Sequence, residues 1–166
     1  EFYKDGKYEF KADGKSLYKD ELLSIYVSWT KKYPLILIED GFAEDDWEGF
    51  KLLEEKLGEE VMNVGDDLLV TDIKRLEKGI EKECVNAILI KLNQVGTVSE
   101  TVEVIRRAEE VGMNCIISHR SGETEDTFIA DFAVGSGVGF IKTGSMSRSE
   151  RIAKYNRLMR IERALN

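Results

Sequence analysis

The chain has 166 residues, of which 42% are hydrophobic and 34% charged, a composition typical of a folded globular protein and not of a disordered one. It carries 32 acidic and 24 basic residues, a formal net charge of -8, which excludes nucleic acid and anionic membrane surfaces as expected partners. No apolar run reaches the roughly 18 residues that span a bilayer, and residues 1–10 do not resemble a signal peptide. We therefore expect a cytoplasmic protein without membrane insertion.

The first third of the chain predicts a short hairpin followed by a helix. Turn signals occur at Asp5-Gly6 and Asp13-Gly14, and apolar residues then recur at helical spacing over residues 19–32. Pro34, the only proline, ends this helix. No linker-like stretch rich in Gly, Ser or Pro divides the chain, so we expect a single domain over residues 1–166.

From residue 35 onward, short apolar runs alternate with amphipathic segments. Continuous apolar runs are typical of parallel strands covered on both faces, and their alternation with helices predicts an α/β fold of βα units. The expected strands are 35–39, 61–66, 87–91, 115–119 and 138–142, and the expected helices are 46–57, 72–83, 99–111, 125–134 and 149–165.

Two helix starts and two cysteines complete the local predictions. Thr97 with Glu100, and Ser147 with Glu150, have the spacing of capping boxes. Cys84 and Cys115 are too distant in sequence for a metal knuckle or a redox pair. We expect both to be reduced thiols in the core.

Each of the five apolar runs ends in one ionisable residue. These are Glu39, Asp66, Lys91, His119 and Lys142. A single carboxylate at a strand end is commonly a helix cap or a solvated loop residue, but five in a row are unusual. In a (β/α) barrel the carboxyl ends of the strands meet at one mouth, where substrate binds. We therefore expect two acids, two lysines and the only histidine to share one pocket.

The residue types at this mouth predict a particular chemistry. Two carboxylates without a neighbouring thiol or imidazole cluster suit a hard cation such as Mg²⁺. A cation with two ammonium groups can stabilise a dianionic intermediate, and a lysine near positive charge can lose its proton and act as a base. Arg120 and Ser121 offer a guanidinium fork and a hydroxyl to a phosphate group. The pattern indicates proton abstraction next to a carboxylate.

These residues lie in segments that resemble the enolase (phosphopyruvate hydratase) family over almost the whole chain. The matching stretches include EFYKDGKYEF, IED-x-FAEDDW, GDDL-x-VT, LIKLNQVGT, SHRSGETEDTFIAD, IKTG and RSERIAKYNRLMRIE. The resemblance implies reversible dehydration of 2-phosphoglycerate to phosphoenolpyruvate in glycolysis, with Mg²⁺ as cofactor. Enolase-superfamily sites use a Lys or His base and one or two Mg²⁺ ions to stabilise an ene-diolate.

The resemblance also implies roles for individual residues. Glu39 and Asp66 look like Mg²⁺ ligands, Lys91 looks like the base, and Lys142 looks like the partner of the substrate carboxylate and of the ene-diolate charge. His119, Arg120 and Ser121 look like contacts of the substrate and its phosphate.

The length predicts an incomplete barrel. A whole eight-stranded barrel typically needs about 250 residues, whereas this chain offers about five βα units preceded by a hairpin and a helix. The resemblance implies that the N-terminal domain and the first barrel strands are absent. With them would go a third ligating aspartate, the glutamates of acid catalysis and a mobile loop that binds a second Mg²⁺.

Two other functions stay open at this stage. The chain could be a truncated, designed or pseudoenzyme partial barrel that acts as a scaffold or binding module, or a member of the enolase superfamily with another acid substrate. An open sheet exposes edge strands that need a partner. We therefore expect a homodimer or a complementing N-terminal fragment, and the isolated chain to be inactive.

Overall fold

The chain folds into a five-stranded parallel sheet with helices and a three-stranded antiparallel sheet near its N-terminus. A computed structural model describes residues 2–166. The elements in chain order are β1 Tyr3–Lys4, β2 Lys7–Phe10, the 3-10 helix Lys11–Asp13, β3 Lys15–Leu17, α1 Lys19–Lys32, β4 Leu37–Glu39, α2 Trp47–Leu57, β5 Met62–Gly65, α3 Ile73–Lys82, β6 Ala87–Ile90, α4 Leu92–Val95, α5 Val98–Glu110, β7 Asn114–Ser118, α6 Phe128–Gly135, β8 Phe140–Lys142 and α7 Ser149–Leu165.

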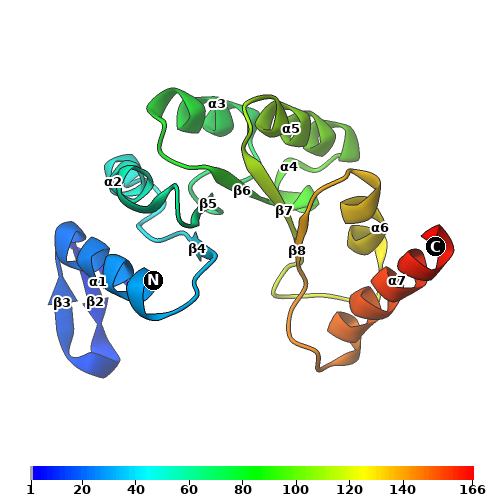
Figure 1. Ribbon diagram of the computed structural model, residues 1–166, viewed down its shortest axis with the longest axis horizontal. Helices are drawn as coiled ribbons and strands as arrows, with labels where there is room; N and C mark the ends of the chain where they lie inside the picture. Colours follow the sequence, from blue (N-terminus) through cyan, green and yellow to red (C-terminus); the bar gives the residue numbers. More distant parts are fainter. Residues whose placement is uncertain (1) are drawn as a thin grey trace.

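The five parallel strands follow one another in space in the order in which they occur in the chain, β4-β5-β6-β7-β8. Figure 1 shows them as a curled sheet, with α2, α3, α5 and α6 along its convex side. The small sheet and α1 lie next to α2, at the β4 end, and α7 lies at the β8 end. This arrangement is that of part of a TIM-type barrel, which confirms the predicted fold class.

The two faces of the sheet bury different residues. Because side chains alternate along a strand, Ile88, Ile90 and Ile117 enter the large core between the sheet and the helices. Leu89 and Ile116 belong instead to a small separate cluster with Val64, Ala87, Leu37 and Met62. In the register of the sheet Leu89 lies opposite Ile116. The apolar runs are thus continuous because both faces are covered.

Short polar side chains start several helices. Asp72 accepts hydrogen bonds from the backbone N–H groups of Lys74 and Arg75, both at 2.9 Å, before α3 begins. Thr97 caps α5 by accepting from the Glu100 backbone N–H at 3.2 Å, which is one half of the predicted capping box. In the other half, the Glu100 side chain accepts from the Thr97 hydroxyl in place of the Thr97 backbone N–H. Such caps satisfy donors that have no partner within the helix.

Two local predictions need correction, and one helix was not expected. Arg148, with φ at 70°, precedes α7 in place of the predicted Ser147 cap, and no side chain caps this helix. The helix expected from residue 125 begins at Phe128, because residues 120–127 form the loop that α7 holds. The four-residue helix α4, directly after Lys91, was not predicted.

The remaining sequence expectations concern the thiols and the membrane. Cys84 and Cys115 are both buried and not in a disulfide. Within residues 2–166, none of the helices combines the length and the apolar character that crossing a membrane requires.

Candidate active site

The five ionisable residues of the strand ends all lie at the carboxyl edge of the parallel sheet. Glu39 and Lys142 are the last residues of β4 and β8, and Asp66, Lys91 and His119 directly follow β5, β6 and β7. In a parallel sheet this edge carries the ligand-binding loops. The structure therefore places every predicted residue at the expected edge, while their chemical roles stay predictions.

Lys91 and Asp66 form a close and largely buried ion pair. The Lys91 Nζ lies 2.6 Å from the Asp66 Oδ2, and the two side chains are only 12% and 10% exposed. The backbone N–H of Lys91 donates to the Thr71 Oγ1 at 3.0 Å, and the Thr71 hydroxyl donates to the Gln94 side chain at 2.8 Å. The position of Lys91 is thus fixed at both its backbone and its ammonium group.

Lys142 and Glu39 form the second ion pair, which joins the two edge strands of the sheet. The Lys142 Nζ donates to both oxygens of Glu39, at 2.5 and 2.7 Å. Glu39 ends β4 and Lys142 ends β8, so three strands separate them in the sheet order. Only a strongly curled sheet brings these two side chains together. The pair marks the mouth of the concave side.

The carboxylates of this mouth fit a hard divalent cation. Asp66 Oδ1 is buried and has no hydrogen-bond partner within residues 2–166. A buried carboxylate oxygen without a hydrogen-bond partner destabilises the folded state unless a cation or a hydrogen-bond donor binds it. Asp66 and Glu39 offer only oxygen donors, the type that Mg²⁺ prefers. In this structure the two lysines neutralise the two acids, so a cation would compete with both ammonium groups.

Asp40 is a further acid of this mouth, which the sequence pattern did not indicate. Its Oδ1 accepts from the backbone N–H of Asp66 at 2.9 Å, and its Oδ2 from that of Asp67 at 2.8 Å. One oxygen each of Asp40, Asp66 and Asp67 lies within 4.8 Å of the others. Burial raises the pKa of Asp40 to about 6, against the lowering effect of the two N–H groups. Asp40 therefore fixes the loop that carries Asp66.

The predicted substrate contacts lie on the loop after β7. The backbone N–H of His119 donates to the Lys142 carbonyl at 2.9 Å, which ties the loop to the end of β8. The guanidinium of Arg120 reaches the Asn93 side chain at 2.7 Å, and its backbone N–H donates to Glu123 at 2.9 Å. Arg120 and Ser121 are exposed. Two of the three candidate contacts are thus accessible to a ligand.

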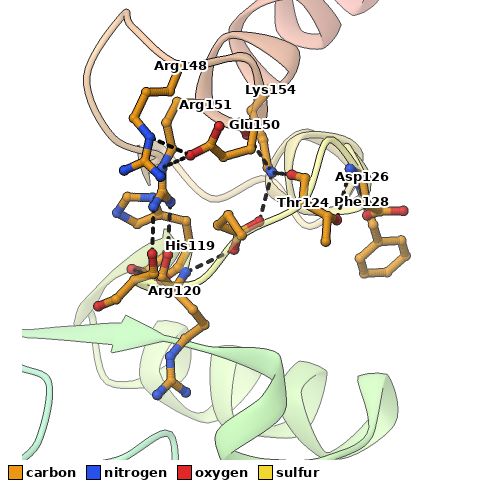
Figure 2. Close-up of polar contacts among 12 residues, drawn as sticks. His119, Arg120, Thr124, Asp126, Phe128, Arg148, Glu150, Arg151 and Lys154 are labelled. Carbon is orange, nitrogen blue, oxygen red and sulfur yellow. Dashed lines mark hydrogen bonds and ion pairs between the residues drawn. The ribbon is translucent and has the colours of Figure 1, made fainter.

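Two buried cations of α7 hold this loop, and neither was predicted to have a role. Arg151 is 7% exposed and Lys154 only 1%. Figure 2 shows both side chains pointing from α7 toward the His119 loop, with Arg151 against His119 and Lys154 against Thr124. Charged groups are rarely buried without partners. Arg151 and Lys154 lie in the N-terminal part of a helix that carries several other basic residues, so the sequence gives no signal of this contact.

A separate surface cavity of about 540 Å³ lies beside the small antiparallel sheet. It is lined by Tyr3, Gly6, Tyr8, Lys19, Ala43, Glu44, Asp45 and Asp46. Two of these residues form a close ion pair, in which Lys19 Nζ lies 2.6 Å from Asp46 Oδ1. Asp46 is also the N-cap of α2, so its carboxylate already has partners. None of the predicted site residues lines this cavity.

Comparisons with known proteins point to one family. The family described as "Enolase, C-terminal TIM barrel domain" matches residues 1–166. An enolase from a Nitratiruptor species is 59% identical over 165 residues, which is 99% of this chain. The match covers 39% of that relative, so the chain spans about two fifths of its length.

Proposed function

Because the chain belongs to the enolase family, we propose that its mouth is the barrel side of a site for reversible dehydration of 2-phosphoglycerate to phosphoenolpyruvate, with Mg²⁺. The observation that carries the proposal is the set of two carboxylates and two ammonium groups, paired at 2.6 and 2.5 Å at the carboxyl ends of β4, β5, β6 and β8. This set matches the residues that the family resemblance assigns.

Lys91 is the proposed base. Its amine takes the proton from the carbon next to the substrate carboxylate, a task that requires a fixed nitrogen within reach of that carbon. Its side chain is 12% exposed and fixed by Asp66. The buried, oriented position of Lys91 therefore suits proton abstraction better than that of an exposed lysine.

Lys142 is the proposed partner of the substrate carboxylate. Its side chain is 42% exposed and its ammonium group contacts Glu39, so the ammonium group can leave this carboxylate and bind that of a ligand. A fixed positive charge at this point stabilises the negative charge that develops when the proton leaves. Arg120 and Ser121, on the exposed loop after β7, are the proposed phosphate contacts.

Glu39 and Asp66 would hold the cofactor. Mg²⁺, when bound, supplies a positive charge that stabilises the ene-diolate. The unpartnered Oδ1 of Asp66 is the atom that most clearly favours this assignment.

The family resemblance assigns acid catalysis and a third metal ligand to a part of the relatives that this chain does not cover. We therefore expect the 166-residue chain to need that part for turnover. The test is phosphoenolpyruvate formation from 2-phosphoglycerate with Mg²⁺, with and without the portion of the Nitratiruptor relative outside the match. We expect activity only with the added portion, and loss of that activity in Lys91→Ala.

The matched control is Lys56→Ala, which removes an exposed lysine at the end of α2. It should leave turnover unchanged. A complemented protein with full activity in Lys91→Ala would overturn the assignment of the base. Binding of Mg²⁺ without turnover in the complemented protein would favour a scaffold or binding module instead.

A further inference from the structure

Arg151 contacts three successive residues of the loop after β7. Its Nη1 lies 2.5 Å from the Nδ1 of His119 and donates to the Arg120 carbonyl at 2.9 Å, and its Nη2 donates to the Ser121 carbonyl at 2.9 Å. These are the three residues proposed to bind the substrate. A guanidinium presents its donors in a rigid fork, so one side chain fixes the whole turn.

Lys154, one helical turn later on α7, holds the next part of the same loop. Its ammonium group contacts Glu123 at 2.7 Å, the Thr124 carbonyl at 2.5 Å and the Glu150 carbonyl at 2.8 Å. All three of its donors are therefore used. Glu123 in turn accepts from the backbone N–H of Arg120, so the two cations act on one connected loop (Figure 2).

The contact between Arg151 and His119 decides which ring nitrogen of the histidine carries a proton. A guanidinium has only donors and keeps its proton in proteins, so the Nδ1 that faces it must accept. The proton of the neutral ring then lies on Nε2, since the bond made by one nitrogen sets the state of the other. Within residues 2–166 the structure gives Nε2 no hydrogen-bond partner. Nε2 is therefore free to donate to a ligand.

Gly144 gives independent support for this contact. Its φ is +87°, and a Cβ at this position would lie 2.7 Å from the Cδ of Arg151 and 3.2 Å from the Cε1 of His119. Only glycine therefore leaves room for the arginine to reach the histidine here. The hydroxyl of Tyr155, also on α7, donates to the Gly144 carbonyl, which holds this backbone in place.

We propose that Arg151 is a positioning residue that fixes His119 as the neutral Nε2–H tautomer, so that the ring offers a hydrogen-bond donor to an anionic substrate at the mouth. His119 then binds the substrate as a donor and does not relay protons. The link to the substrate rests on the proposed function, whereas the tautomer depends only on the contact with Arg151.

His119 is the only histidine of the chain, so nitrogen NMR of the ¹⁵N-labelled 166-residue protein reads its ring without ambiguity. In the wild type at pH 8 we expect Nδ1 to be unprotonated and Nε2 protonated, in one set of signals. In Arg151→Met we expect both nitrogens to show averaged signals of two tautomers. Burial lowers the pKa of His119, and the charges of Arg151, Lys142 and Lys154 lower it further against the opposite effect of Glu123. Loss of the Arg151 charge in this variant should therefore raise the pKa of His119.

The control on the same helix is Arg157→Met, which removes an ion pair with Asp131 that does not involve the loop. It should leave the His119 signals unchanged. Gly144→Ala serves as a second variant that displaces Arg151 while keeping its charge, and it should also mix the tautomers. A protonated Nδ1 in the wild type would overturn the proposal whatever the variants do. Unchanged signals in a folded Arg151→Met would also overturn it, and neither result depends on turnover.

Discussion

Lys142 and Glu39 lie 103 residues apart in the sequence and at opposite edges of the five-stranded sheet, yet the lysine Nζ contacts both oxygens of the glutamate, at 2.5 and 2.7 Å. The pair connects the two ends of the curled sheet at the mouth where the other candidate residues lie. The ammonium group of Lys142 thus occupies Glu39, the carboxylate that we propose as a metal ligand.

Removal of Lys142 should strengthen Mg²⁺ binding. In Lys142→Met the cation no longer competes with an ammonium group for Glu39, and one nearby positive charge is lost. Partly exposed pairs of this kind contribute modest energies, so we expect Kd for Mg²⁺ to fall roughly three- to tenfold. Isothermal titration calorimetry measures this change. Glu39→Gln should have the opposite effect, and weaker binding in Lys142→Met would contradict the assignment of Glu39 as a ligand.

Loss of Lys91 should destabilise the fold. The Lys91→Met variant leaves the Asp66 carboxylate, which is 10% exposed, without its cation. Breaking such a pair from one side costs about 3 kcal/mol. Urea unfolding at pH 7 should show this loss in Lys91→Met, and the double variant Lys91→Met with Asp66→Leu should regain most of it. An unfolding free energy equal to that of Lys56→Met would show that the pair is not buried in solution.

Asp40 should make stability depend on pH between about 4 and 6. Its pKa in the folded protein, raised to about 6 by burial, is above the unfolded value of 3.8. The folded state then binds more protons than the unfolded state in this window, so Asp40 lowers the free energy of unfolding as the pH rises. Asp40→Asn should remove this slope. Because asparagine offers a single acceptor where Asp40 uses two, the comparison concerns the slope and not the absolute stability.

Both thiols should resist alkylation in the native protein. Burial raises the pKa of Cys84 to about 11 and that of Cys115 to about 12. Only the thiolate reacts with iodoacetamide, and at pH 8 very little of it forms. Mass spectrometry should show no modified cysteine in the native protein and two in the protein unfolded in guanidinium. Rapid modification of either native thiol would mean that its strand opens locally.

The sequence predicts the strands and their ends well, because the five runs are apolar on both faces and each ends in a charged residue. Residue pattern alone thus leads to the edge where Asp66 and Lys91 meet. It cannot show which acid pairs with which lysine, because that depends on the curl of the sheet. The contact between Glu39 and Lys142 required the structure.

The supporting residues were missed for a similar reason. Asp40 follows Glu39 directly, and nothing in the sequence distinguishes an acid that fixes a neighbouring loop from one that is exposed to solvent. Arg151 and Lys154 stand in a helix rich in basic residues, where exposed lysine and arginine are the ordinary case. The predicted cap at Ser147 fails because Arg148, with its positive φ, turns the chain into α7. These contacts depend on packing between distant segments, which no local pattern records.

The most direct measurement is the exchange of the C2 proton of 2-phosphoglycerate with D₂O, followed by proton NMR with Mg²⁺ and the complementing portion of the relative. This reaction reports the action of the base alone and does not require loss of the hydroxyl group. We predict deuterium incorporation with the wild-type chain and with Lys56→Ala, and at least a roughly hundredfold slower incorporation, the contribution of a positioned base, with Lys91→Ala. Exchange at the wild-type rate in Lys91→Ala would contradict the assignment of Lys91 as the base.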